Sequence, residues 1–324
     1  MSSIFGKKKT KGEKTVALVD IESGSVGAAL VGLSKNEAPK LFAEKRISLP
    51  VRHARDSDTL FRAVTEATEE ALHHTSNVSS RMRNHKALSG QGEIDRIAIF
   101  LSPPWASLHL TGGTAEYVEP MRRAINHMTQ GVFGNIPTTF HPLGTAAAHG
   151  AAALFPFNTP SVLLNVGGEV SEILILTDSA ILGHATIPLG RHTLLRTLMS
   201  HGGVSAAEAG SYMALNRREG HVLFEPMRVS EDHFASSVAE ATRDLNHSQD
   251  LLSGIIVMAE EPLGEIVAKA LSREESLSEL FLEGGTVRSM RAPHVMPYIA
   301  AHAQKPDLCL LLEALFIDRK FALR

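Results

Sequence analysis

Two short turns rich in glycine and serine carry the residues of this sequence that could do chemistry. In the later turn, Gly167 and Gly168 separate two apolar runs. Such a pair can form a tight hairpin turn, because glycine adopts positive φ at little cost. Alternatively, the missing Cβ atoms let backbone N–H groups approach a phosphate. Spacing alone favours the hairpin turn. The earlier turn, Ser23-Gly24-Ser25, follows shortly after Asp20.

Apolar runs bounded by turn residues predict the strands that must position both turns. The expected strands are Thr15–Asp20, Val26–Leu33, Leu41–Leu49, Asp95–Ser102, Ile136–His141, Val162–Val166, Ile173–Thr177, Ala180–Pro188 and Gly254–Met258. One further strand with a turn is expected from Leu280–Leu282 and Gly285–Val287.

The helical spacing of apolar residues predicts the elements that connect these strands. The expected helices are Asp58–His74, Tyr117–Met128, Gly144–Leu154, Ser205–Arg218, Glu231–Leu252 and Pro262–Leu271. Asp307 is expected to cap a last helix, and the polar stretch Ser76–Glu93 is expected to form a loop. Both halves then share one order of elements, which predicts an α/β fold with an internal repeat of β-β-β-α-β-α units.

Composition excludes several classes of function. The formal net charge of −3 gives no reason to expect a nucleic-acid partner. The single cysteine, Cys309, rules out a disulfide framework and lies in an apolar run typical of a core. The histidines lack the spacing of metal ligands, so no metal site is expected. Without an apolar stretch of transmembrane length or a signal peptide, we expect a cytoplasmic protein.

Two features of the sequence predict contacts with partners. Met1–Lys14 is rich in lysine and is expected to be a disordered basic tail. Each lysine near anionic lipid contributes about 1 kcal/mol, so the tail gives at most a peripheral membrane contact. Trp105 follows two prolines, and it is expected either to anchor a partner from a surface loop or to pack in the core.

The two turns and their surroundings resemble the phosphate motifs of the actin-like ATPase superfamily, within its FtsA and PilM branch. The first motif corresponds to Asp20–Ala29, DIESGSVGAA. The second corresponds to Asn165–Ile173, NVGGEVSEI, followed by Ile187–Arg191, IPLGR. The likeness extends in the same order from Thr15 onwards. The basic opening and the last helix are closer to PilM, a family of type IV pilus assembly proteins.

The resemblance implies an actin-like (ribonuclease H-like) fold, with duplicated β-β-β-α-β-α domains flanking a central cleft. Residues 1–14 would be the tail, 15–160 plus 300–324 would form domain I, and 161–299 would form domain II. FtsA and PilM insert a subdomain into domain I. Here it would be reduced or missing, because only Pro103–Pro142 is available for it.

The resemblance also implies which residues would line a nucleotide cleft. The candidate cofactor-binding residues are Asp20, Ser23, Gly24, Ser25, Asn165, Gly167, Gly168, Glu208 and Glu260. Glu208 corresponds to the second position of an AExxK helix motif. Glu260 lies in the stretch that corresponds to the adenosine loop, Ile256–Gly264, for which Leu282–Thr286 is the alternative.

Several of these positions depart from the pattern of active relatives. Asn165 replaces an aspartate, and an amide cannot act as a base or carry the charge that holds the waters of Mg²⁺. Glu22 replaces a glycine, and two like charges about 4 Å apart repel by about 4 kcal/mol at an effective dielectric constant near 20. Lysines are replaced by Gly27 and Ser211, and glycines by Arg191, Glu260 and Glu261. We therefore expect a degenerate ATPase with no catalytic residue and no cofactor, with ATP and Mg²⁺ as the alternative.

The resemblance implies a scaffold or adaptor of the PilM/FtsA type, with little or no ATP hydrolysis. It would act in type IV pilus assembly, at the cytoplasmic face of the inner membrane. The expected partner is an inner-membrane protein with a short cytoplasmic segment, and self-association is a second class of contact. There are two alternatives: an FtsA-like cell-division protein that forms filaments, and an active actin-like ATPase or phosphotransferase.

Overall fold

The computed structural model describes residues 13–35, 37–51, 56–85, 92–106, 115–156, 159–178, 180–215, 219–247, 250–301 and 303–322. The predicted basic tail, apart from Glu13 and Lys14, lies outside these residues. The chain forms two compact units. The first comprises Met1–Leu49, Ser57–Gly150 and Ala292–Arg324, and the second comprises Pro50–Asp56 and Ala151–Arg291.

The first unit contains a mixed sheet with the strand order β11-β3-β2-β1-β4-β5. Its strands are β1 (Lys14–Ile21), β2 (Ser25–Ser34), β3 (Glu37–Ser48), β4 (Arg96–Leu101), β5 (Thr138–Pro142) and β11 (Ala300–Ala301). β1, β2 and β3 form an antiparallel meander, whereas β4 runs parallel to β1 and β5 runs parallel to β4. Short turns can join the antiparallel strands, but the parallel strands need helical crossovers.

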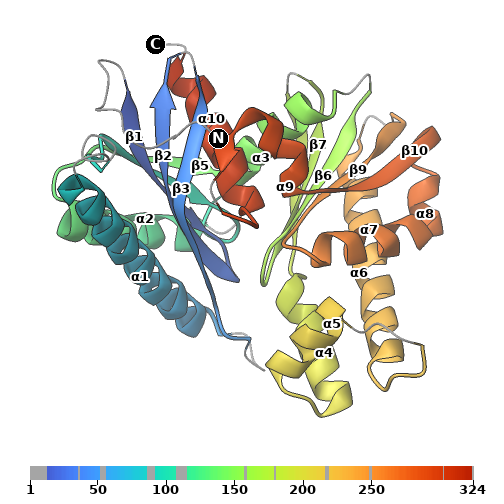
Figure 1. Ribbon diagram of the computed structural model, residues 1–324. Helices are drawn as coiled ribbons and strands as arrows, with labels where there is room; N and C mark the ends of the chain where they lie inside the picture. The colour runs from blue at the N-terminus through green and yellow to red at the C-terminus, as the bar shows by residue number, and fades with distance from the viewer. Residues whose placement is uncertain are drawn as a thin grey trace. The chain divides into compact units, whose positions relative to one another are not determined.

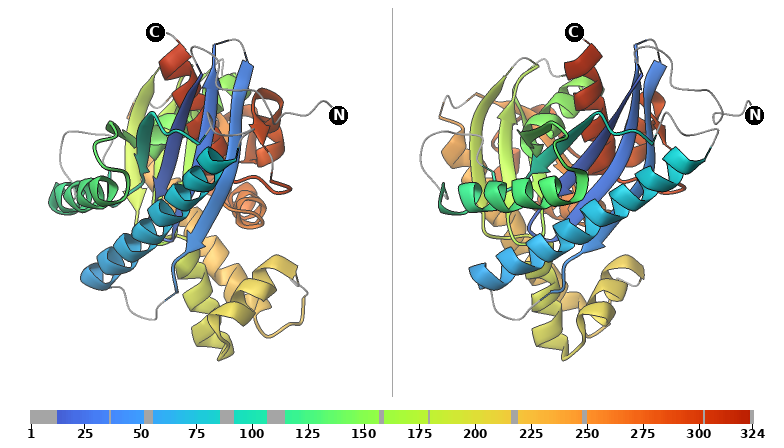
Figure 2. Two further views of the ribbon diagram at one scale, coloured as in Figure 1. Left: turned by 60° about the vertical axis from the view of Figure 1, so that its left-hand side comes forward. Right: turned by 90° about the vertical axis from the view of Figure 1, so that its left-hand side faces the viewer.

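Helices cover both faces of this sheet. They are α1 (Ser57–Asn84), α2 (Ala115–Phe133), α3 (Leu143–Leu154), α9 (Ala292–Val295) and α10 (Leu308–Ala322), with a short 3₁₀ helix η1 (Met296–Tyr298). α1 and α2 lie on one face of the sheet, and α10 lies on the other (Figures 1 and 2). The boundary with the second unit falls within α3.

The side chains of β1 alternate between the two faces of the sheet, and one of these faces is covered by α10. Val19 and Ile21 belong to the core cluster that includes Val64 of α1. Because successive strand residues point to opposite faces, Asp20 lies on the face that α10 covers. The rings of Phe100 on β4 and Phe316 on α10 are 5.9 Å apart on this face. Asp20 is therefore directed into the interior of the first unit.

The second unit is built on a sheet with the strand order β10-β9-β6-β7-β8. Its strands are β6 (Ser161–Val166), β7 (Ser171–Leu176), β8 (Ile181–Ile187), β9 (Leu252–Met258) and β10 (Phe281–Met290). Its helices are α4 (Arg191–Gly202), α5 (Ala206–Leu215), α6 (Phe224–Leu245), α7 (Leu263–Arg273) and α8 (Glu275–Ser278). Val162, Leu164 and Val166 of β6 pack with apolar residues of α4–α7 in one buried cluster.

The two sheets have the same topology. The order β3-β2-β1-β4-β5 in the first unit matches β8-β7-β6-β9-β10 in the second. In each unit an antiparallel meander is followed by parallel strands that helices connect. This confirms the predicted α/β fold with duplicated β-β-β-α-β-α units.

Several predicted elements have different boundaries in the structure. The prediction of a loop over Ser76–Glu93 is wrong for its first part, because α1 continues to Asn84. The added turns of α1 bury Ser79 and Met82. α6 begins seven residues before the predicted Glu231 and ends at Leu245. Leu252 then begins β9 instead of ending a helix. α4 was not predicted at all.

Trp105 packs in the core and does not project from a surface loop. Its side chain is 1% exposed, and its ring meets that of Phe61 edge to face at 6.0 Å. A helix long and apolar enough to cross a membrane is not found among the described residues.

Candidate functional site

The first phosphate-motif stretch is organised around Arg46, which the sequence did not single out. Asp20 lies near the end of β1, and Ser25 begins β2. Arg46, on β3, donates from Nη2 to Asp20 Oδ2 at 2.5 Å and from Nη1 to Ser25 Oγ at 2.7 Å. One guanidinium thus holds two of the predicted cofactor-binding residues.

Asp307 completes the coordination of this guanidinium. Arg46 Nη2 donates to Asp307 Oδ1 at 3.0 Å, and its Nε donates to the other carboxylate oxygen. Asp307 Oδ1 also accepts from the backbone N–H of Leu310 at 3.1 Å. This confirms that Asp307 caps the last helix, α10. Arg46 therefore ties the start of α10 to β1 and β2.

Gly27 provides the space that Arg46 occupies. It lies opposite Arg46 in the β2–β3 register. A Cβ atom at Gly27 would lie 2.7 Å from Arg46 Nη2, which is closer than such contacts allow. In the first phosphate motif of the FtsA and PilM branch, which this sequence resembles, a lysine stands at the position of Gly27. In this chain the lysine is absent, and the arginine of the neighbouring strand fills the space.

Burial acts on each of the three acids of this cluster, Asp20, Asp307 and Glu313. It raises the pKa of Asp20 to about 7, although the Arg46 charge acts in the opposite direction. For Asp307 burial also acts upward, but the charge and hydrogen bonds of Arg46 outweigh it and lower the pKa. Burial and the nearby Asp20 raise the pKa of Glu313, on α10, well above its usual value. Within the described structure, Asp20 Oδ1 and both Glu313 carboxyl oxygens are buried and accept no hydrogen bond.

Other polar groups of the first turn also form hydrogen bonds. Ser25 Oγ donates to the Glu22 carboxylate, so Glu22 folds back onto its own turn. The carbonyl of Gly24 accepts from the N–H of Leu49 at 2.8 Å. Ser23 is completely buried. The named hydrogen bonds of the first turn are therefore all made within the first unit.

The second turn is held against the start of α4. The carbonyls of Gly167 and Gly168 accept from the N–H groups of Arg191 and His192 at 2.9 and 2.8 Å. A Cβ at Gly190 would lie 2.6 Å from the Gly167 oxygen and 2.5 Å from the Gly168 oxygen, so this close approach requires glycine. Two N–H groups at the start of α4, which could otherwise face an anion, thus bond to the turn.

Glu169 turns away from this backbone and pairs with side chains of α4. Arg196 donates to its two oxygens at 2.8 and 2.7 Å, and His192 Nδ1 lies 3.0 Å from one of them. Burial opposes ionisation here, but the hydrogen bonds from Arg196 and His192 prevail and lower the pKa of Glu169 to about 2. Glu169 is therefore a fixed anion that orients α4.

Asn165 and Glu260 lie near this second turn. Asn165 is the residue of β6 that pairs with Met258 of β9, and Glu260 follows two residues after Met258. The Glu260 carboxylate forms an ion pair with Arg191, at the start of α4. In the β6–β7 register Asn165 also lies opposite Glu172, which is within 3.0 Å of His184 Nε2.

Glu208 has a local structural role. Its carboxylate accepts from the N–H and the Oγ of Ser205, both at 2.8 Å, at the start of α5. The Ser205 hydroxyl accepts from the Glu208 N–H at 3.3 Å, which completes a capping box. None of these contacts joins Glu208 to Asn165, Gly167, Gly168 or Glu260.

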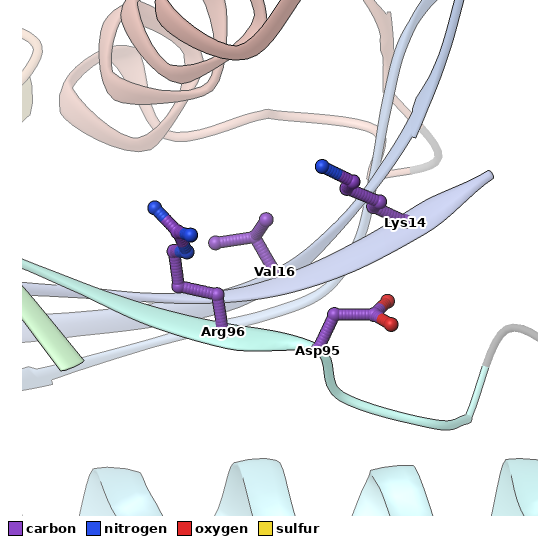
Figure 3. Close-up of a pocket in the computed structure, with 4 residues that line it drawn as sticks. All are labelled: Lys14, Val16, Asp95 and Arg96. Atoms are coloured by element: carbon purple, nitrogen blue, oxygen red, sulfur yellow. The ribbon is translucent and has the colours of Figure 1, made fainter. Parts of the chain in front are cut away.

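A small hollow in the first unit lies at the other end of β1 from Asp20. It has a volume of about 130 Å³ and is lined by Lys14, Val16, Asp95 and Arg96. Lys14, Val16 and Arg96 extend from the same side of the sheet (Figure 3). Asp95 Oδ2 accepts from the N–H of Thr15 at 2.7 Å. This hollow contains none of the predicted cofactor-binding residues.

Arg46 is the functional candidate that sequence reasoning missed. It stands in the charged run Glu44-Lys45-Arg46, which is typical of a solvated strand. A signal was nevertheless present, because Gly27 lacks the lysine of its motif and the next strand supplies a cation. Glu313 gave a similar signal, since it is an acid between apolar residues of α10.

Comparisons with known proteins identify the fold. No family model matches the sequence, and no curated protein matches it. The chain is similar to a chain of the PilM–PilN type IV pilus biogenesis complex, with a TM-score of 0.55, 9% identity, and coverage of 97% of this chain and 98% of that one. It is also similar to the ethanolamine utilization protein EutJ from Carboxydothermus hydrogenoformans, with a TM-score of 0.52, 15% identity, and coverage of 86% and 91%.

Both of these proteins have the actin-like ATPase fold. The match runs over nearly the whole of both chains for the PilM–PilN structure. The chain therefore has the actin-like ATPase fold. This confirms, for the fold, the resemblance that the motifs indicate.

Proposed function

We propose that this protein is an actin-like scaffold or adaptor with little or no ATP hydrolysis. It would act at the cytoplasmic face of a membrane assembly of the type IV pilus kind. The fold match to a chain of the PilM–PilN complex supports the kind of assembly. The groups of both turns that resemble phosphate motifs are hydrogen-bonded to other groups of the chain, which supports little or no ATP hydrolysis.

The observation that carries this proposal is the position of Arg46. Its guanidinium bonds to Asp20, Ser25 and Asp307 inside the first unit. Asp20 corresponds to the aspartate that positions the metal in active relatives. In this chain the Asp20 side chain is fully buried. A metal ion at Asp20 would compete with the Arg46 guanidinium, whose positive charge already lies against Oδ2 of this carboxylate.

The second turn supports the same conclusion. Asn165 cannot act as a general base, because an amide does not accept a proton at neutral pH. The N–H groups that begin α4 are bonded to Gly167 and Gly168. We therefore propose that the candidate cofactor-binding residues of each unit are remnants of the motifs that they resemble, and that neither ATP nor Mg²⁺ is required.

The partner that we propose is an inner-membrane protein with a short cytoplasmic segment. The complex that contains the similar chain is named for two proteins, PilM and PilN, which supports recognition of a protein partner. The lysines of the first fourteen residues would add a peripheral contact with anionic lipid. The net charge of −3 argues against a nucleic-acid partner.

In-cell photo-crosslinking tests the proposed role. Crosslinker residues would be placed at exposed positions of each unit in the full-length chain, and crosslinked proteins would be identified by mass spectrometry. We expect products with an integral inner-membrane protein. Products with soluble enzymes alone would contradict the proposal.

Two assays on the purified chain test the alternatives. We expect no ATP turnover above that of an Asp20→Ala variant, and no sedimentable polymer with or without nucleotide. Turnover that Asp20→Ala abolishes would establish the ATPase alternative. Nucleotide-dependent pelleting would favour the filament-forming, FtsA-like alternative.

A further inference from the structure

β8 (Ile181–Ile187) is an edge strand of the second unit. It is the last strand in the order β10-β9-β6-β7-β8, so among the described residues it pairs with β7 on one side and with no strand on the other. An edge strand presents a row of backbone N–H and C=O groups that can template a further strand. This makes β8 a candidate surface for strand addition.

The other sheet edges in the described chain are protected. β10 carries Glu283 and Arg288, and its pairing with β9 is irregular between Phe281 and Thr286. β5 has five residues and ends at Pro142, and β11 has only two residues. Charges, irregular pairing, proline and short length are the usual devices that prevent edge-to-edge association.

β8 has fewer of these devices. Its sequence, ILGHATI, contains no lysine, arginine, aspartate, glutamate or proline. Its pairing with β7 is regular from Gly183 to Ile187 and shifts at Leu182, the extra residue of a bulge. The Leu182 side chain is 56% exposed, and among the exposed large apolar side chains of the described residues it is the one that lies in a strand. Thr186 is also exposed.

One face of β8 packs against the interior of the second unit. Gly183 lies beside Leu245 of α6, and Ile187 belongs to the core cluster. These residues fix the strand in the second unit. A strand that is anchored on its core side and contains no lysine, arginine, aspartate or glutamate is suited to pairing with a further strand.

We propose that β8 pairs antiparallel with β8 of a second copy of this chain, forming a two-fold symmetric dimer. Antiparallel pairing of two identical strands is self-complementary, so both copies use the same surface. The composition of β8 favours this occupant, because no lysine, arginine, aspartate or glutamate meets its own copy across the axis. The residue on the axis is His184, whose Nε2 lies 3.0 Å from Glu172 Oε1 of its own chain. An axis through the middle of the strand brings Leu182 of each copy opposite Thr186 of the other. This inference does not depend on the proposed function.

Sedimentation velocity of the full-length chain tests the proposal. The wild-type protein is expected to shift from the chain mass of 34.9 kDa towards twice that mass as its concentration rises. The double variant Leu182→Lys/Thr186→Lys is expected to keep the single-chain mass, because two lysines then meet two lysines. Leu215→Lys is the matched control, since Leu215 is 83% exposed but lies at the end of α5. It is expected to dimerise like the wild type.

Disulfide trapping tests the register. In a Cys309→Ser background, a Leu182→Cys chain mixed with a Thr186→Cys chain is expected to form a crosslinked heterodimer on mild oxidation, because directly opposed strand residues bring their Cβ atoms close together. A Leu215→Cys chain mixed with Thr186→Cys is expected to remain uncrosslinked. Circular dichroism would establish that every variant is folded.

Three results would overturn the proposal. The first is a wild-type mass that stays at 34.9 kDa up to submillimolar concentration. The second is a folded lysine double variant that dimerises as well as the wild type. The third is a wild-type dimer in which Leu182→Cys and Thr186→Cys crosslink no more than the Leu215→Cys control.

Discussion

The two phosphate-type turns occupy equivalent places in two sheets of the same topology, yet their polar groups are satisfied in different ways. The β1–β2 turn is closed by a partly buried arginine from a third strand, which also holds the start of α10. The β6–β7 turn is closed by its own glycine carbonyls, which accept from the start of the following helix. The contacts of the first turn are ionic and mostly shielded from solvent, whereas those of the second turn are largely backbone hydrogen bonds.

This difference indicates where each unit is sensitive to substitution. Removing the cation of a mostly buried ionic cluster leaves its carboxyl partners without a counter-charge, which is strongly destabilising. A backbone contact survives most side-chain changes. The ion pair between Arg191 and Glu260 near the second turn is partly exposed, so solvent screens it. We therefore expect the first turn to depend on one side chain and the second turn to depend on several small contacts.

Arg46→Ala is expected to have the largest effect. It leaves the buried Asp20 and the partly buried Asp307 without their cation, so the unfolding free energy should fall by roughly 3–5 kcal/mol. Urea denaturation would measure the loss. Hydrogen exchange would place the loss in β1 and α10. Equal protection of these elements in variant and wild type would contradict the structural role of Arg46.

Glu169→Gln is expected to have an intermediate effect in the second unit. The substitution removes the charge that Arg196 and His192 share, and hydrogen bonds to charged groups contribute about 1.5–3 kcal/mol. The protection of α4 should decrease, while that of α10 should not change. A loss of protection in both units would contradict the separation of the two networks.

The two turns are also expected to respond to pH in opposite directions. The pKa of Asp20 rises from 3.8 to about 7 on folding, so its stabilising contribution is complete below pH 3.8 and is lost as the pH rises to about 7. The pKa of Glu169 falls from 4.5 to about 2, so its contribution is complete above pH 4.5 and is lost as the pH falls to about 2.

Variants separate these two contributions. Asp20→Asn should reduce the decline in stability between pH 4 and 7, the range set by the pKa of Asp20. Glu169→Gln should reduce the decline below pH 4.5. Denaturation midpoints measured across both ranges would check this. If Asp20→Asn changed the low-pH limb instead, the assignment of Asp20 would be wrong.

Arg191→Ala is expected to have the smallest effect. Its partner Glu260 is 56% exposed in its side chain, and exposed ion pairs contribute about 0–1 kcal/mol. The variant serves as the matched control for Arg46→Ala, because each removes one arginine next to a phosphate-type turn. A loss as large as that of Arg46→Ala would contradict the comparison.

Much of the fold was predictable because strand periodicity and turn residues are local signals. The two meanders and the duplicated order follow from apolar runs such as Val162–Val166, which match the observed strands within a few residues. The missed helix α4 begins directly after Gly190 with Arg191 and His192, and Gly190 offers no side-chain cap. The start of α6 was missed because Pro226 stands in its first turn, where proline is tolerated.

The arrangement within the candidate site was predictable only in part. The motifs located Asp20, Ser25 and the Gly167–Gly168 turn by sequence position alone. The role of Arg46 depends on the β2–β3 register, which places it opposite Gly27. That register is a tertiary property and no single motif contains it. Asp307 was recognised as a helix cap, but its pairing with Arg46 spans most of the chain and left no local signal.

Calorimetric titration of ATP with Mg²⁺ into the wild-type protein at low salt tests the central claim most directly, because weak electrostatic binding is strongest there. Since both phosphate-type turns are occupied by groups of the chain itself, we predict no saturable heat of binding. Saturable, Mg²⁺-dependent binding in the micromolar range would contradict this account.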